Sequence, residues 1–521
     1  MAQATVGNGG GGAISRGFAG VGSVMQLYDG AQFYVASGTV TFPFDTWTVD
    51  RIEVLGGPGS VLYGDGAIGG VVNIVPRKPN PFSHENSTRV AFGSFNTWRG
   101  AFDTAGPINE RLSYRLDLSH NRSDGWMERG DTQSTAVSAS VRHQVSEAFS
   151  LTVSEDFGYQ RPQQYFGAPT LNGLVVDSFR KTNYNVADAD VHYKDSWSQV
   201  KAEWQPSSAL SLRSGLQILT SDRFWRDVEI YTYQSTGVIR RSDYIEIFHH
   251  QRQYGSRTDA VYNNAVLRKP NTISAGFEYN HIRFKHVNNG PFGGISIVAP
   301  GNPDPGVFIN LTGTTPRFRT RSNQLAVFAE DRLMVTPRVS LVGGVRMDRH
   351  AVNRLNIPEA VSGDRTFNPV SGRGGVVYSI TPGVAIYGQY ATATDSIGNV
   401  ITQSIAQQLF DLTTGRQVEV GAKQSFMNGR AEWTLAGYRI VKNKLLAPDP
   451  SNPGLSLQIG QQSSRGMEAT ASIGARGVRV DANATFLRAR FDDFAENVGG
   501  VRVSRVGNTP PNVPRRAANL W

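Results

Sequence analysis

The chain has 521 residues, of which 39% are hydrophobic and 18% are charged, and 56 residues are glycine. This composition excludes a disordered acidic chain and a helical bundle, and it fits many strands interrupted by glycine. The formal net charge is +9, but the basic residues are scattered and form no basic block of the kind that nucleic-acid binders carry. We therefore expect no nucleic-acid partner, and we assign the positive charge to solvated loops and a polar lumen.

The first informative stretch runs from residue 49 to residue 79, where two short apolar runs flank a glycine-rich middle. It predicts a strand, a turn and a second strand. Gly64–Gly69 matches the G-x-G-x-x-G pattern of dinucleotide-binding proteins, but that pattern requires a helix after its third glycine. The β-branched run Val71–Val75, closed by Pro76, predicts a strand instead, so the glycines are interpreted as turn residues.

Long segments of alternating polar and apolar residues follow and continue almost to the end of the chain. In one of them, Ser113, Arg115 and Asp117 alternate with leucines and a tyrosine, and Leu210–Ile218 and Val478–Phe486 repeat the pattern. No apolar run reaches the eighteen residues of a transmembrane helix. A transmembrane strand needs only about ten residues with every second one apolar, so the pattern predicts a barrel with a wet lumen.

The connections between these segments alternate in length, which favours a barrel over a β-sandwich, since a sandwich has no reason to sort its loops by length. Counting the segments gives about eighteen strands, the last beginning near Arg515. Short turns are expected near residues 106–111, 145–148, 205–209, 269–272, 336–338, 381–383 and 427–429, and long loops near 160–190, 222–253, 288–319, 350–366, 395–415 and 444–456.

Several ordered motifs resemble the plug domain of TonB-dependent outer-membrane receptors, in particular the ferric-siderophore group of the hydroxamate type. They are Ile14-Ser-Arg-Gly-Phe18, Leu27-Tyr-Asp-Gly30, Phe42-Pro-Phe-Asp45 and the stretch at 49–79. The resemblance implies an all-β fold, a transmembrane antiparallel barrel with a partial N-terminal plug inside its lumen. Residues 1–80 would form the plug and 81–521 the barrel.

The resemblance also implies that the chain is truncated at both ends. The export signal, the TonB box and the first part of the plug would precede Met1, whose surroundings lack a signal pattern. Family barrels have 22 strands, and Pro510–Arg516 resembles the strand entry about four strands before their end. The first and eighteenth strands would then be unpaired edges, which are costly in lipid, so the chain alone is expected not to form a stable barrel.

The function implied by the resemblance is to bind a ferric siderophore and import it with energy supplied by TonB. We expect a monomer in the bacterial outer membrane, in contact with its lipid, with no enzymatic activity and no permanently bound cofactor, since iron would enter as substrate. A non-transporting fragment and a passive porin-like channel remain alternatives. So do heme, cobalamin or a sugar as ligand.

No catalytic or metal-binding motif contradicts that expectation. The sequence has no H-E-x-x-H, no G-K-[ST] after a glycine loop and no cysteine. His249, His250, His281 and His286 lack carboxylates at metal-ligand spacing and are expected in loops or the lumen.

Aromatic residues are the candidate ligand-binding groups, because rigid rings suit a bulky organic chelate. Aromatic girdles at the membrane boundary are the competing interpretation. Ala168 replaces a large aromatic of a related receptor, which predicts a wider pocket or a different ligand. The resemblance assigns the following residues to the ligand pocket: Phe33, Tyr34, Tyr165, Phe166, Tyr231 and Tyr233.

A second implied site joins the plug to the barrel. The family places two plug arginines against two barrel glutamates, and here Arg16, Glu419 and Glu468 match three of these positions, while Gly56 replaces the second arginine. A buried acid without a partner is costly. We therefore predict weakened plug seating that Gly56→Arg would correct, unless Arg51 or Lys423 compensates.

Overall fold

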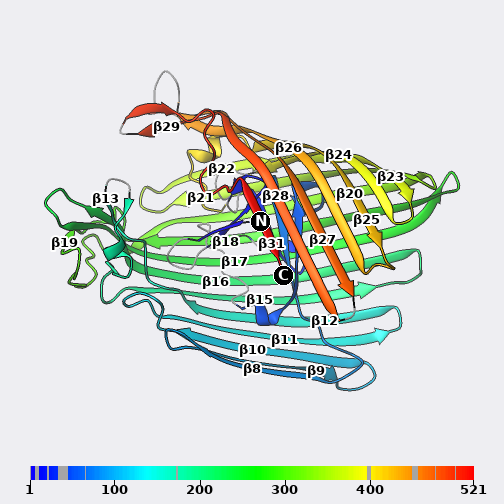
Figure 1. Cartoon of the computed structure of the whole chain (residues 1–521), viewed down its shortest axis with the longest axis horizontal. Coiled ribbons are helices and arrows are strands. Elements are labelled where there is room, and N and C mark those ends of the chain that lie inside the picture. Colours follow the sequence, from blue (N-terminus) through cyan, green and yellow to red (C-terminus); the bar gives the residue numbers. More distant parts are fainter. Residues whose placement is uncertain are drawn as a thin grey trace.

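The computed structural model describes the whole chain except residues 1, 6–10, 20–22, 33, 35–44, 65, 172–173, 396–400, 449–455, 476 and 499. A wide antiparallel sheet curls around the N-terminal segment, with long loops at one end and short turns at the other (Figure 1). The fold is thus all-β, a barrel with a plug. None of the helices described is both long and apolar enough to cross a membrane.

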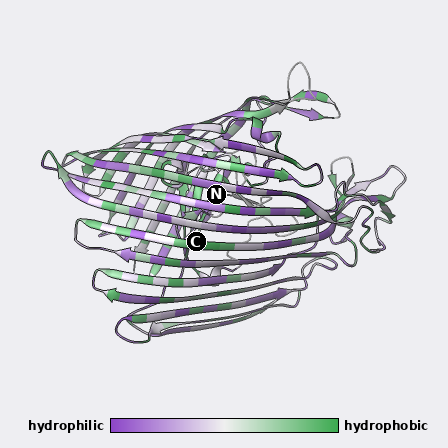
Figure 2. Cartoon of the chain, turned by 180° about the vertical axis from the view of Figure 1, so that it is seen from behind, coloured by the Kyte–Doolittle hydropathy of each residue, from purple (hydrophilic) through white to green (hydrophobic). Residues whose placement is uncertain are grey.

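The alternation expected from the sequence decides which side chains enter the lumen. Ser113, Arg115 and Asp117 of β10 (Leu112–Ser123) are buried inside, whereas Leu118 is 37% exposed on the outer face. Hydrophilic and hydrophobic residues alternate along the strands of the wall (Figure 2). Because side chains point to opposite faces of a strand in turn, the wall can be apolar outside and polar inside.

The strands of the wall are β8 (Glu85–Gly93), β9 (Thr97–Pro107), β10 (Leu112–Ser123), β11 (Thr132–Ser146), β12 (Phe149–Arg161), β15 (Asp190–Trp204), β16 (Leu210–Tyr233), β17 (Ile239–Val266), β18 (Lys269–Asn288), β19 (Ser296–Val298), β20 (Thr315–Thr336), β21 (Val339–Asn356), β22 (Val361–Phe367), β23 (Val370–Thr381), β24 (Val384–Asp395), β25 (Thr413–Phe426), β26 (Ala431–Pro448), β27 (Ser456–Ala475), β28 (Val478–Asp493) and β31 (Arg516–Leu520). The short β19 pairs with the tip of β17, and β22 and β23 pair with successive parts of β21.

The strand order is that of a closed barrel in which β31 stands between β28 and β8. This differs from the two free edges that the sequence analysis expects, because the curl of the sheet brings the last strand round to the first. The strand pairing at this point of the barrel wall is nevertheless short. Only five residues of β31 pair with β28, and all five are exposed.

The sequence-based prediction of long loops is wrong in two places. Residues 222–253 belong mostly to β16 and β17, which pair continuously up to Tyr233 and Ile239, and residues 350–366 belong mostly to β21 and β22. A strand that only crosses a bilayer needs about ten residues, whereas these ladders continue well beyond that length. The expected short turn at 269–272 lies instead at Leu267 and Arg268, both with positive φ.

The plug contains a four-stranded sheet in the order β5-β4-β7-β6, in which β4 and β7 are parallel. Met25, Leu27, Ala67 and Val71 form its buried apolar core. The proposed domain limit at residue 80 falls between the end of β7 and the start of β8. The plug elements are β1 (Ala2–Thr5), β2 (Gly11–Ser15), β3 (Phe18–Ala19), β4 (Val24–Tyr28), β5 (Ala31–Gln32), η2 (Thr46–Thr48), β6 (Val49–Gly56), α1 (Ser60–Tyr63) and β7 (Gly70–Pro76).

The remaining elements lie in the long loops. They are β13 (Thr170–Leu171), β14 (Leu174–Val175), η3 (Asp177–Phe179), η4 (Gln407–Leu409), β29 (Ala495–Val498) and β30 (Val501–Ser504).

Candidate functional site

The first contact between plug and wall is made by Arg16, in the turn between β2 and β3. Its Nη1 donates to Glu419 Oε2 at 2.5 Å, and its Nη2 and Nε donate to the two carboxylate oxygens of Glu468 at 2.8 and 3.1 Å. Glu419 lies on β25 and Glu468 on β27. The structure thus brings together the three residues that the sequence analysis assigned to this cluster.

Neutral groups complete what we call the Arg16 cluster. Gln417 accepts from Arg16 Nη1 at 3.1 Å, Tyr387 donates to Glu419 at 2.9 Å, and the guanidinium stands 4.3 Å from the ring centre of Tyr438. Burial by itself would lower the pKa of Arg16, but the hydrogen bonds and charges of Glu468 and Glu419 outweigh it and raise that pKa. One guanidinium fork therefore serves both acids.

Gly56 leaves no gap in this cluster. A β-carbon added at Gly56 would lie 2.9 Å from Arg16 Nε and 3.0 Å from its central carbon. Neither suggested substitute takes part, since Arg51 pairs with Asp50 and Glu53 on the exposed edge of the plug and Lys423 is exposed. The Arg16 side chain therefore occupies the space that an arginine at position 56 would need.

This geometry reverses the expected effect of Gly56→Arg. We expect the substitution to displace the Arg16 guanidinium and to lower the free energy of plug unfolding by about 2 kcal/mol, as overpacking of a filled site does. Hydrogen exchange of the β7 amides in the purified protein would measure it. Val54→Arg, at an exposed position of the same strand, is the control and should change nothing. Slower exchange in Gly56→Arg would contradict the steric argument.

A second contact, which sequence reasoning missed, is made by Lys442 on the lumen face of β26. Its Nζ lies 2.6 Å from Asp395 Oδ2 and 2.7 Å from Ser23 Oγ, and Ser23 donates to the same carboxylate at 2.9 Å. Asp395 is fully buried. We call these three residues the Lys442 cluster. A lysine at an inward position of an alternating strand was the only signal for it in the sequence.

Further polar contacts surround the plug on other strands. They join Asp29 to Lys201, Asp45 to Arg99 and Asn121, and the carbonyl oxygen of Leu62 to Arg257 and Arg346. The plug is therefore held by charges and hydrogen bonds around much of the wall.

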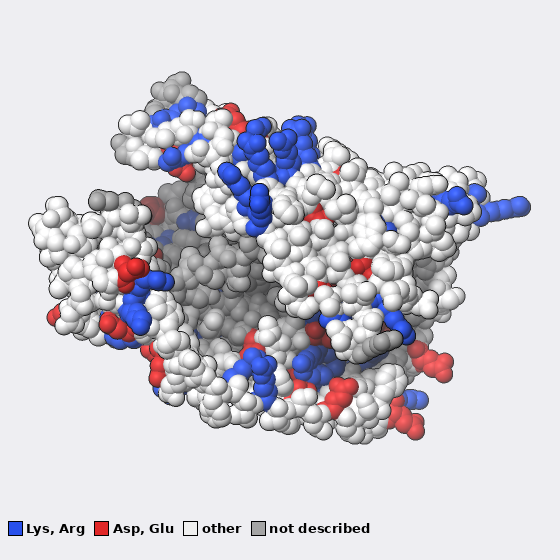
Figure 3. All heavy atoms as spheres, viewed as in Figure 1, with Lys and Arg blue, Asp and Glu red and all other residues white. Residues whose placement is uncertain are grey.

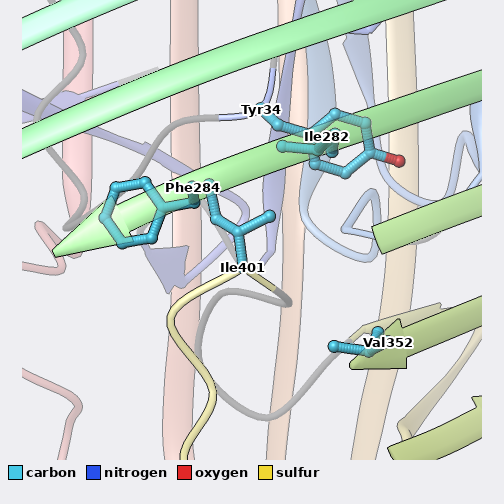
Figure 4. Packing of buried hydrophobic residues seen from close by; sticks show 5 residues of the cluster. All are labelled: Tyr34, Ile282, Phe284, Val352 and Ile401. Carbon is cyan, nitrogen blue, oxygen red and sulfur yellow. The ribbon is translucent and has the colours of Figure 1, made fainter. Parts of the chain in front are cut away.

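Of the two plug aromatics predicted to bind ligand, Phe33 lies outside the described residues. Tyr34 is 7% exposed and packs with Ile282, Phe284, Val352 and Ile401 (Figure 4). Its hydroxyl donates to Gln324 on β20. Tyr34 thus joins the plug to the wall.

Tyr231 and Tyr233 pack against the loop that follows β12. Tyr233 stacks on Phe179 with ring centres 6.1 Å apart. The ring centres of Tyr231 and Tyr184 are 5.8 Å apart, and the Tyr231 hydroxyl donates to the carbonyl oxygen of Val228. In this arrangement they fix a long loop to the end of β16.

Tyr165 and Phe166 line a cavity of about 1060 Å³ at the loop end of β9 to β12. Arg122, Arg161 and Glu229 provide its charged lining. The lining of this cavity also contains buried polar atoms without partners. Among the described residues, the buried amide oxygen of Gln160 and amide nitrogen of Gln163, both in the lining, have no hydrogen-bond partner.

Comparison with known proteins identifies this architecture. Residues 150–521 match the model of the TonB-dependent receptor-like β-barrel, and residues 1–71 match the TonB-dependent receptor plug domain. The chain belongs to the TonB-dependent receptor family.

Among relatives of this TonB-dependent receptor, the metal-pseudopaline receptor CntO of Pseudomonas aeruginosa is 26% identical over 81% of the chain and 61% of its own length. The ferrioxamine receptor of Yersinia enterocolitica is 24% identical over 97% of the chain and 71% of its own length. The chain thus spans between 61% and 71% of the length of these two relatives.

The fold of the TonB-dependent receptor is that of the siderophore receptor PiuA from Acinetobacter baumannii, with a TM-score of 0.87 and 17% identity, over 100% of this chain and 80% of the other.

Two histidines of the receptor face each other inside the lumen, near Tyr34. His249 Nε2 and His286 Nδ1 are 2.8 Å apart, and the His286 ring stacks on Phe318. In the part of the chain that the structure describes, no group of three or more His, Cys, Asp or Glu is placed to hold a metal ion.

Proposed function

We propose that this TonB-dependent receptor binds a ferric siderophore in the cavity lined by Tyr165 and Phe166 and imports it when TonB acts on the plug. Iron would enter as part of the substrate rather than as a resident cofactor. The observation that supports the proposal is a large cavity at the loop end of a barrel whose lumen holds a plug.

The lining of the cavity suits a large polar chelate. Its volume of about 1060 Å³ slightly exceeds that of ordinary ligand sites, which span roughly 300 to 1,000 Å³. Phe166 and Tyr165 offer rigid apolar faces, while Arg122 and Arg161 can donate to the oxygens of an organic shell. The unpaired amide groups of Gln160 and Gln163 would gain partners on binding.

A passive channel is the less favoured alternative, because the Arg16 and Lys442 clusters hold the plug inside the lumen. The proposed receptor would act as a monomer in the outer membrane, with TonB as its energy-supplying partner. Steady large conductance of the purified protein in planar bilayers would support the channel instead.

Removing the aromatic and basic lining is expected to weaken siderophore binding. Phe166→Ala and Arg161→Gln should each raise the Kd for the preferred chelate about tenfold, as loss of a central aromatic or arginine contact does. A panel of ferric hydroxamate and catecholate siderophores, titrated by quenching of tryptophan fluorescence, would identify the chelate and measure the change.

The matched control is Tyr254→Ala, which removes an aromatic ring from the outer face of β17, where Tyr254 is 42% exposed. Its Kd should equal that of the wild type. The cavity would be the wrong site if all three variants bound the chelate equally well. Failure of every siderophore in the panel to bind would reject the proposed substrate class.

A further inference from the structure

A row of arginines crosses the outer face of the barrel on β26, β27 and β28. Arg439 is paired in register with Arg465, and Arg465 with Arg488. Together with Arg490 they line a small cavity of about 120 Å³. We call these four residues the arginine row.

The side chains of the row point away from the lumen. Arg439 lies between Tyr438 and Ile440, which are buried against the plug. In the same way, Arg465 follows the buried Ser464, and the buried Ala489 separates Arg488 from Arg490. Since successive side chains of a strand point to opposite faces, the arginines face outward, and all four are exposed. Part of the positive charge therefore lies on the outer wall, which the sequence analysis did not expect.

The row stands at the edge of the apolar belt. On the outer face of β28, Val478, Val480 and Phe486 are exposed with alanines between them, and Arg488 follows. Val478 and Arg488 are ten residues apart, about 33 Å along a strand at about 3.3 Å per residue. A strand tilt of about 40° reduces this to about 25 Å of height, which is the height of the apolar band of such barrels.

The row lies at the loop end of these strands, because β28 leads into the long connection that contains β29 and β30. Long loops of outer-membrane barrels face outward, so the arginines stand at the level of the outer headgroups. Basic atoms gather over this part of the face (Figure 3). A similar pair, Arg283 opposite Arg321, occurs on β18 and β20.

The row has little internal compensation. Among the described residues, Arg490 alone of the four forms an ion pair, with Asp492 at 2.7 Å. Like charges directly opposite each other on neighbouring strands repel. A phosphate group relieves this repulsion, and the guanidinium fork matches its oxygens with two parallel hydrogen bonds.

From these observations we propose that the arginine row binds the phosphorylated headgroup of a lipid in the outer leaflet. The lipid tails would lie along the apolar belt below the row while its phosphates bridge the guanidinium groups of adjacent strands. The site differs in place and chemistry from the siderophore cavity, so it does not depend on the proposed transport function.

Native mass spectrometry of the detergent-purified full chain, titrated with diphosphoryl lipid A, would test the site. We expect R465Q/R488Q to weaken binding about 25-fold, from about fivefold for each basic residue removed at an anionic lipid surface. R465K/R488K should show intermediate binding, because lysine keeps the charge but loses the fork. Monophosphoryl lipid A should bind more weakly than diphosphoryl lipid A, and phosphatidylcholine should not compete.

The control is R180Q/R505Q, which removes the same charge from two loop residues, the exposed Arg180 and the half-buried Arg505, and should bind like the wild type. Equal binding by R465Q/R488Q, with a native circular dichroism spectrum, would overturn the proposal. So would equal binding of phosphatidylcholine, which would indicate apolar contact only, or displacement of the lipid by millimolar inorganic phosphate alone.

Discussion

Arg16→Ala is expected to lower the free energy of plug unfolding by about 3 kcal/mol, near the low end for removal of one member of a buried ion pair. The substitution leaves the Glu419 side chain, 6% exposed, beside Glu468 with no cation between them. The Glu468 side chain is 29% exposed, so water reaches it and keeps the loss from being larger. Hydrogen exchange of the β4 and β7 amides measures the change.

Arg51→Ala is the matched control, because it removes a plug arginine whose side chain is 54% exposed. Its effect on the free energy of plug unfolding should be small, as for surface ion pairs. Arg16→Lys should fall between the wild type and Arg16→Ala, because lysine keeps the charge but cannot form the fork. Unchanged exchange in Arg16→Ala would show that the cluster does not hold the plug.

Lys442→Met is expected to cost more, about 4 kcal/mol, because it leaves the fully buried Asp395 without its cation. Ser23 and the backbone N–H of Ile68 would remain as neutral donors to this carboxylate. Exchange of the β4 amides, next to Ser23, would report the loss.

Two comparisons isolate the charge effect. Lys444 lies two residues after Lys442 on the same strand, is exposed and pairs with Asp411. Lys444→Met should therefore leave the free energy of plug unfolding nearly unchanged. Lys442→Met with Asp395→Leu removes both charges and should recover most of the stability, since an apolar pair can replace a buried ion pair. A double variant as unstable as Lys442→Met would mean that packing, not charge, is lost.

The three charged residues of the Arg16 cluster, Arg16, Glu419 and Glu468, could be anticipated from the sequence because they lie in short motifs, Ile14–Phe18, Gln417–Lys423 and Ser464–Glu468. The Lys442 cluster could not, since it joins β24, β26 and the plug through single residues with no local pattern around them. Pairing across strands that are not neighbours in the barrel wall becomes visible only when the plug is in place.

The effect of Gly56 was misjudged for a related reason. The motif shows that an arginine is missing, but only the packing shows that Arg16 already occupies its space and reaches both acids.

The predicted loop at 222–253 illustrates another limit of the sequence. Alternation continues along β16 and β17 beyond the membrane, and bilayer thickness alone gives no sign of where such a ladder ends.

The polar nature of the plug contacts has a mechanical consequence. The Arg16 and Lys442 clusters and the ion pairs of Asp29 and Asp45 consist of groups whose hydrogen bonds water can take over one at a time. A pulling force applied at one point of the plug would load these contacts in succession. The peak force is then set by the strongest single cluster rather than by the whole interface, and the broken contacts can re-form when the load is removed.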